Sequence, residues 1–139
     1  MRNKFYALLA AILLSVVMVA QAADNKPTAQ NFTDPNKAII LKPDQTTFML
    51  KLKSNPTTGY SYFLLHYDSN IITPVSRTYH APEKSMPGAG GYEEWEFKAK
   101  PEAFTVPRAT VITLVYAKPW EVQNPTSVNF KIITMDQNK

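Results

Sequence analysis

Residues 46–60 read TTFMLKLKSNPTTGY, an alternating run followed by the turn that ends it. From Phe48 to Leu52 large apolar residues recur at every second position, the period of a strand with one buried face. The Asn55-Pro56 pair then stops the strand, because proline restricts the residue before it and has no N–H to donate. Gly59 can adopt the positive φ that closes a tight loop. The stretch therefore predicts a β-strand that runs into a stiff loop.

Short segments of the same kind recur along the chain, separated by turn residues, and no convincing helical period is present. The expected strands are 38–41, 46–53, 60–67, 71–79, 94–99, 111–116 and 128–133. Pro74 predicts an edge strand or a bulge. Residues 111–116 are largely apolar on both faces of the expected strand, which predicts a central strand. About seven strands predict an all-β fold, an antiparallel β-sandwich, although periodicity alone also allows a small barrel.

Two later stretches have the same loop chemistry. Residues 81–91 contain Pro82, Pro87 and three of the four glycines of the chain, so they form an extended loop. Pro119 breaks the ladder again inside Lys118-Pro119-Trp120. If the strands alternate in direction, these two loops and the Asn55 loop lie side by side at one end of the sandwich.

Together the three loops resemble the signature of the chagasin-like inhibitors of papain-family cysteine peptidases. That signature consists of an NPTTG-aromatic loop, a GxGG loop and an R/K-P-W loop. It is matched here by Asn55-Pro56-Thr57-Thr58-Gly59-Tyr60, Gly88-Ala89-Gly90-Gly91 and Lys118-Pro119-Trp120. The resemblance implies an immunoglobulin-like topology and a protein that binds a papain-family cysteine peptidase.

The resemblance also implies a role for each loop. Residues 55–60 would enter the catalytic centre, with Thr57 and Thr58 beside the cysteine and histidine of the enzyme. Residues 88–91 would follow the unprimed side of the cleft, and residues 118–120 would pack on the primed side. Inhibition would then be reversible, competitive and non-covalent. Lys118 stands where the family often has arginine, which removes the planar guanidinium from that contact.

The N-terminus has the pattern of an export signal. Arg2 and Lys4 form a basic start, residues 5–20 are apolar, and Ala20-Gln21-Ala22 supplies small residues for a signal peptidase. We expect residues 1–22 to be removed, which leaves residues 23–139 as one inhibitor domain in the periplasm or outside the cell. Residues 23–36 are polar and are expected to be a poorly ordered leader.

Composition limits the partners. The net charge of +4 includes Arg2 and Lys4, so the mature chain carries about +2, with its lysines scattered. Nucleic acid and a membrane are therefore not expected as partners. The chain has no cysteine, so its stability depends on the core, and a thiol nucleophile is excluded. We expect a monomer when free, with no cofactor and no metal.

The remaining polar residues do not predict catalysis. His66 is expected to be a structural histidine and His80 a solvated one, and neither accompanies a nucleophile motif. Glu94 and Glu96 should share one solvated face of a strand. The second hypothesis, after the peptidase inhibitor, is a non-inhibitory exported sandwich of the adhesin or carbohydrate-binding type. The third hypothesis is a hydrolase that uses either histidine.

The two tryptophans are expected to differ. Trp95 alternates with other apolar residues and is assigned to the core. Trp120 lies in a loop and is assigned to the interface, where a large apolar side chain with one donor can act as an anchor.

Overall fold

A computed structural model describes residues 29–84, 86 and 88–136, apart from the side chains of residues 122–124. The predicted signal segment, residues 1–22, and Pro87 lie outside the described residues. The elements are β1 (Gln30–Phe32), β2 (Ile39–Leu41), β3 (Thr47–Ser54), the 3-10 turn η1 (Pro56–Thr58), β4 (Ser61–His66), β5 (Ile72–His80), β6 (Gly91–Ala99), the 3-10 turn η2 (Pro101–Phe104), β7 (Arg108–Lys118) and β8 (Glu121–Thr134).

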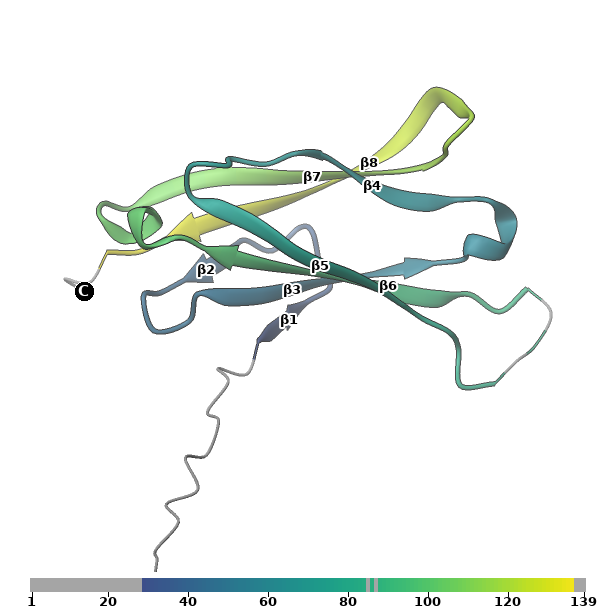
Figure 1. Cartoon of the computed structure of the whole chain (residues 1–139), viewed down its shortest axis with the longest axis horizontal. Helices are drawn as coiled ribbons and strands as arrows, with labels where there is room; N and C mark the ends of the chain where they lie inside the picture. Colours follow the sequence, from purple (N-terminus) through teal and green to yellow (C-terminus); the bar gives the residue numbers. More distant parts are fainter. Residues whose placement is uncertain (1–28, 85, 87, 137–139) are drawn as a thin grey trace, which may run out of the picture.

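The strands form two four-stranded sheets packed face to face (Figure 1). One sheet has the order β1-β3-β6-β5 and the other the order β2-β8-β7-β4. The short strands β1 and β2 pair in parallel with β3 and β8, and all other pairs are antiparallel. The predicted all-β, immunoglobulin-like sandwich is confirmed, with eight strands in the described part of the chain instead of about seven.

The additional strand is β1, within the segment predicted to be a poorly ordered leader. Gln30 to Phe32 pair with Phe48 to Leu50 of β3, and Phe32 packs against the core. Three polar or mixed residues carry no strand signal of their own, so this strand depends on its partner.

The core lies between the sheets and consists of inward-facing residues of inner and edge strands, together with Ala103 and Phe104 of η2. Phe48, Leu50 and Leu52 of β3 are buried, as the alternation predicts. The rings of Phe48 and Phe97 stack with their centroids 5.7 Å apart. The fully buried residues Phe130 and Ile132 bring β8 into the same cluster. A continuous apolar layer therefore fixes which strand ends lie together.

Two local predictions are confirmed. Strand β5 is one of the two edge strands of its sheet, and its register with β6 shifts between Pro74 and Ser76, so Pro74 marks both an edge and a bulge. Strand β7 is an inner strand, paired on both sides with β4 and β8.

The prediction for His66 is wrong. It lies at the end of the edge strand β4, beyond a register shift that follows Leu64, and it is exposed. Edge strands offer such positions to solvent because one side has no neighbouring strand. His80 is less solvated than predicted, since its ring stacks on Tyr92 and its Nε2 lies 2.9 Å from Oε2 of Glu94.

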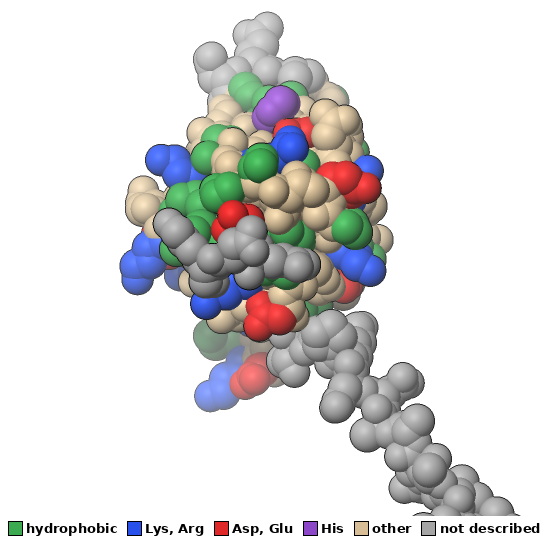
Figure 2. Space-filling view, turned by 90° about the vertical axis from the view of Figure 1, so that its left-hand side faces the viewer, with side chains coloured by type: hydrophobic (Ala, Val, Ile, Leu, Met, Phe, Trp, Pro, Cys, Tyr) green, Lys and Arg blue, Asp and Glu red, His purple; other side chains and the backbone are tan. Residues whose placement is uncertain are grey.

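Figure 2 looks onto the end that is on the left in Figure 1, and there hydrophobic, basic and acidic groups are interspersed. The loops with the predicted inhibitory motifs lie at the other end, on the right in Figure 1.

In the described part of the chain, no helix is long and apolar enough to cross a membrane.

Candidate functional site

The three predicted loops meet at one end of the sandwich (Figure 1). They connect β3 to β4, β5 to β6, and β7 to β8. A β-carbon placed on Gly59 would lie 3.1 Å from Cη2 of Trp120, so the first and third loops touch. A β-carbon on Gly90 would lie 3.1 Å from the carbonyl oxygen of Ser54, so the second loop lies against the start of the first. The prediction that the loops are adjacent is therefore confirmed.

The first loop is held by hydrogen bonds within itself. Thr57 Oγ1 donates to Oδ1 of Asn55, and Thr58 Oγ1 donates to the carbonyl oxygen of Asn55, both at 2.6 Å. The N–H of Gly59 donates to the carbonyl oxygen of Pro56 at 2.9 Å. Gly59 has φ of 83°, the left-handed conformation that closes the turn and that glycine adopts at least cost. The loop is a compact turn with both threonines exposed.

Other strands anchor the same loop. The N–H of Asn55 donates to the hydroxyl oxygen of Tyr116 in β7 at 3.1 Å, and Nδ2 of Asn55 lies 3.4 Å from the carbonyl oxygen of Gly88. The ring of Tyr60 stacks on Tyr116 with centroids 5.3 Å apart. Asn55 therefore connects the first loop to the second loop and to the opposite sheet.

The second loop packs closely against the sheet backbone, and glycine residues make this possible. Gly88 has φ of 80° and is exposed, and the N–H of Ala89 donates to the carbonyl oxygen of Met86 at 3.0 Å. Gly91 begins β6 opposite Ser54, and a β-carbon there would lie only 1.9 Å from the carbonyl oxygen of His80. Side chains do not fit at that position, so the loop can close only through glycine.

The third loop is a two-residue turn, Pro119-Trp120, between β7 and β8. Trp120, the second residue of this turn, is 74% exposed. Lys118 Nζ lies 3.1 Å from Oε2 of Glu121 and 5.1 Å from the centroid of the Tyr60 ring. The hydrogen bond to Glu121 and the negative charge of that carboxylate raise the pKa of Lys118. The turn therefore presents a large apolar group beside a cation that is already oriented.

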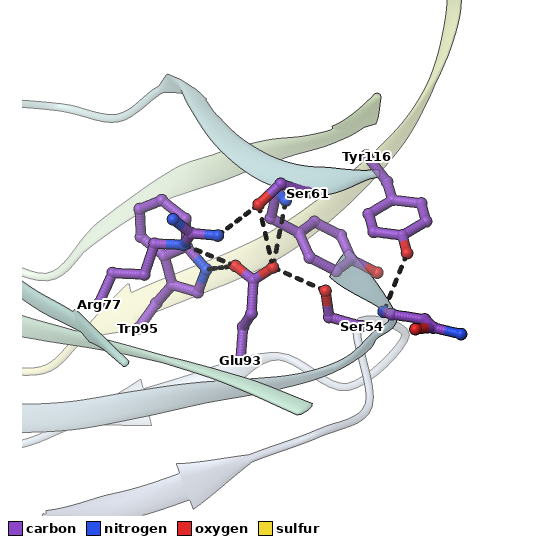
Figure 3. Close-up of polar contacts among 8 residues, drawn as sticks. Ser54, Ser61, Arg77, Glu93, Trp95 and Tyr116 are labelled. Atoms are coloured by element: carbon purple, nitrogen blue, oxygen red, sulfur yellow. Dashed lines mark hydrogen bonds and ion pairs between the residues drawn. The ribbon is translucent and has the colours of Figure 1, made fainter. Parts of the chain in front are cut away.

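Directly behind the first loop lies a buried polar cluster that the sequence analysis missed (Figure 3). Glu93 of β6 has no exposed surface and accepts hydrogen bonds from Ser54, Ser61, Arg77, Trp95 and the N–H of Tyr62. The signal was present in the sequence, because Glu93 shares the inward face of its strand with Trp95 and Phe97. Glu94 and Glu96 lie on the other face of the strand, so the prediction of a solvated acidic face does not extend to Glu93.

Burial alone would raise the pKa of Glu93. The hydrogen bonds from Arg77 and Ser54, the positive charge of Arg77 and the N–H of Tyr62 outweigh it, so the pKa lies below its usual value. The carboxyl group is therefore charged at neutral pH. Beside it, burial and the nearby Tyr116 and Glu93 raise the pKa of Tyr62.

The two tryptophans differ as predicted. Trp95 is partly buried, packs against the core, and its Nε1 lies 3.2 Å from Oε2 of Glu93. Trp120 is free of such packing over most of its surface. Only the second can offer a large apolar area to another molecule.

An open depression of about 1160 Å³ adjoins the second loop. Lys51, Lys53 and Tyr92 line it on the strands, and Asn55 and Gly90 line it at the loops. It continues the loop surface onto β3 and β6. Within the described residues, no group of three or more His, Cys, Asp or Glu side chains is arranged to hold a metal ion.

The structure thus brings all three motifs into one surface, and their roles in binding a peptidase stay predictions. The surface consists of a compact turn, a glycine-rich approach and an exposed tryptophan, which suits recognition of another protein.

Comparison with known families identifies the class of protein. Residues 43–133 match the model of the chagasin family of peptidase inhibitors, I42. The match covers more than half of the chain, and the chain belongs to this family. Membership confirms the predicted function at the level of the family, inhibition of cysteine peptidases.

Two solved structures share the fold. The chain is similar to the cysteine protease inhibitor EhICP2 from Entamoeba histolytica, with 19% identity, a TM-score of 0.60, and 76% of this chain and 95% of that chain covered. It is also similar to amebosin, with 22% identity, a TM-score of 0.56, and 78% and 98% covered. A comparison with curated protein sequences gives no significant match.

Proposed function

We propose that this protein is a reversible, competitive inhibitor of papain-like cysteine peptidases and that its three loops fill the active-site cleft of the enzyme. One observation carries the proposal. The three motifs of the family signature converge on one surface, with Gly59 against Trp120 and Gly90 against Ser54. Three adjacent loops can fill an active-site cleft, with one loop at the central nucleophile and one on each side of it.

The first loop would occupy the catalytic centre without being cleaved. Two of its carbonyl groups already accept hydrogen bonds, the oxygen of Asn55 from Thr58 and that of Pro56 from Gly59. Attack by a nucleophile needs close, aligned approach to a carbonyl carbon, and a turn held by its own hydrogen bonds resists the extension that would provide it. The complex would therefore be non-covalent.

The other two loops would grip the sides of the cleft. Trp120 offers the anchor, and the glycines at 88, 90 and 91 let backbone approach the enzyme closely. The fixed prolines Pro56 and Pro119 limit the conformational entropy lost on binding. We expect Thr57, Thr58, Gly90 and Trp120 to matter more for inhibition than for folding.

The setting of this activity is part of the proposal. The basic start, apolar run and Ala20-Gln21-Ala22 support export, so the inhibitor would act in the periplasm or outside the cell, as a monomer. The target would be a papain-family enzyme that shares this compartment.

The test is a titration of a papain-like peptidase with the purified protein, monitored with a small peptide substrate. We expect saturable inhibition at near-stoichiometric inhibitor, relieved by added substrate. Failure to inhibit several such enzymes, with a folded sample confirmed by circular dichroism, would refute the proposal and favour a non-inhibitory binding module.

A further inference from the structure

Glu93 is an unusual residue to find inside a sandwich, because its carboxylate is fully buried between the two sheets. Removing a charge from water is costly, and a buried ion pair often stabilises a fold no more than apolar residues of the same volume. Stability alone is therefore a weak reason for a carboxylate at this place. Its contacts indicate a more specific role.

The two oxygens of Glu93 face different parts of the molecule (Figure 3). Oε1 accepts from Ser54 Oγ at 2.7 Å, from Ser61 Oγ at 3.3 Å and from the N–H of Tyr62 at 3.4 Å. Ser54 directly precedes the first loop, and Ser61 and Tyr62 directly follow it. One carboxylate oxygen therefore holds both stems of the loop, although the stems belong to different sheets.

The second oxygen holds the carboxylate itself in place. Oε2 lies 2.7 Å from Nε of Arg77 and 3.2 Å from Nε1 of Trp95. Arg77 Nη2 also donates to the hydroxyl oxygen of Ser61. Arg77 thus grips both Glu93 and one stem, so the cluster is fixed from the β5 side as well.

We infer that Glu93 is a positioning residue for the inhibitory loop, fixing the spacing and orientation of the two stems that carry residues 55–60. The inference rests on the proposed function for its effect on a peptidase. It assigns to Glu93 no contact with the enzyme.

The chemistry of the cluster requires a carboxylate. All five groups that face Glu93 donate hydrogen bonds, namely two hydroxyls, a backbone N–H, a guanidinium N–H and an indole N–H. A carboxylate can accept from all of them, whereas glutamine has one oxygen and an amide group that donates. Glu93→Gln would therefore place an amide donor against a fixed donor, either the N–H of Tyr62 at the stems or the N–H groups of Arg77 and Trp95.

The experiment measures the inhibition constant and the hydrogen exchange of the loop in the same proteins. Glu93→Gln should raise the inhibition constant at least tenfold against a papain-like peptidase. It should also speed the exchange of the Thr58 and Gly59 amides, which donate within the loop. A stiff loop binds at lower entropic cost, so both effects have one cause.

A matched control separates positioning from general loss of stability. Thr134→Val removes a buried hydrogen bond, Thr134 Oγ1 to the carbonyl oxygen of Ala103 at 2.6 Å, at the opposite end of the sandwich. It should destabilise the fold and leave both the inhibition constant and the loop exchange within twofold of the wild type, measured where each protein is folded.

A second variant keeps the inference testable if Glu93→Gln does not fold. Replacing both Ser54 and Ser61 by alanine removes the stem hydroxyls that bond to Glu93 and Arg77, and it leaves the hydrogen bonds from Arg77 Nε and Trp95 Nε1 to Glu93 in place. It should weaken inhibition at least fivefold. In a folded Glu93→Gln background, Ser54→Ala should add little, because both changes break the same connection.

The outcomes are distinct. Unchanged inhibition and unchanged loop exchange in folded Glu93→Gln, or unchanged inhibition in the double serine variant, would overturn the inference. If the wild type inhibits no papain-like peptidase, the proposed function fails, and the loop exchange still decides whether Glu93 fixes the loop.

Discussion

Two 3-10 turns of nearly equal length stand at opposite ends of the sandwich, and both begin with proline (Figure 1). The turn η2 places Ala103 and Phe104 in the core, with Phe104 only 6% exposed. The turn η1 buries no residue at all, and Thr57 and Thr58 face solvent. The same local geometry therefore serves two purposes, closing the core at one end and presenting a surface at the other.

The difference lies in what holds each turn. The turn η2 is held by the burial of Ala103 and Phe104, which is non-directional and tolerates small displacements, and by one buried hydrogen bond from Thr134 to the carbonyl oxygen of Ala103. The turn η1 is held by hydrogen bonds from the hydroxyls of Thr57 and Thr58 to Asn55 and from the N–H of Asn55 to Tyr116, and these bonds fix direction as well as position. A surface that must match a partner gains from the second kind of support, since misplacement by even 1 Å weakens recognition.

The largest expected effect is on stability at the η2 end. Phe104→Ala should lower the free energy of unfolding by about 3–5 kcal/mol, because it leaves a cavity in the core. The inhibition constant should stay within twofold when measured where the variant is folded. Chemical denaturation measures the free energy of unfolding. Phe63→Ala is the control, and it should lower this free energy less, because Phe63 is 40% exposed.

Weaker inhibition by folded Phe104→Ala would contradict the separation of the two ends. It would mean that packing at η2 reaches the loops through the strands.

The second effect is on binding at the loop end. Trp120→Ala should weaken inhibition by about 2 kcal/mol or more, as expected of a central aromatic anchor. The free energy of unfolding should change by no more than about 0.5 kcal/mol, because most of the side chain is already in water. Titration and denaturation of the same sample test both statements. Val106→Ala, in an exposed apolar residue between η2 and β7, should affect neither.

Unfolding of the domain by Trp120→Ala would instead assign this tryptophan to the core. The interface assignment would then be wrong.

Much of this arrangement is predictable from the sequence because it follows from local chemistry. The alternation from Phe48 to Leu52 gives the buried face of β3, and Asn55-Pro56 with Gly59 gives the turn that follows. Pro74 predicts the edge and the bulge of β5, because a residue without an N–H cannot complete a central ladder. These residues carry their signal within a few positions.

The features that the sequence analysis missed depend on partners far along the chain. The strand Gln30–Phe32 exists because β3 offers a free edge, and nothing in its own composition indicates a strand. Glu93 is tolerated inside because Arg77, 16 residues earlier, and Ser54, 39 residues earlier, approach it in space. His66 is exposed because a bulge in β4 shifts the register after Leu64. Tertiary contacts decided each case.

The third effect tests the hydrogen bonds that replace packing at η1. Asn55→Ala removes the acceptor for Thr57 and the contact to Gly88, and it should weaken inhibition by about 1–2 kcal/mol. Stability should change less, because these groups can bond to water when the loop opens. Asn70→Ala, in the exposed turn before β5, is the matched control and should leave inhibition unchanged. Equal losses in the two variants would mean that the Asn55 side chain has no special role.

The smallest effect is a dependence on pH that should separate the two turns. The folded pKa of Glu93 is lowered, so its contribution to stability is present above the unfolded value of about 4.5 and is lost as pH falls through the folded pKa. Arg77 is partly exposed, with 42% of its side chain in solvent, so screening keeps this contribution modest. The loss should fall on η1, which the carboxylate supports through its stems, and not on η2.

Two backbone amides, one in each turn, report this pH-dependent loss of stability. The N–H of Gly59 closes η1 on Pro56 at 2.9 Å, and the N–H of Ala103 closes η2 on Lys100 at 3.0 Å. Corrected for intrinsic exchange, the protection of Gly59 should fall relative to that of Ala103 as the pH drops below about 4.5, the unfolded value for Glu93. The relative change should disappear in Glu93→Gln, which has no proton to gain. A parallel loss at both amides would show that acid acts on the whole fold, and that the two ends are not held by different forces.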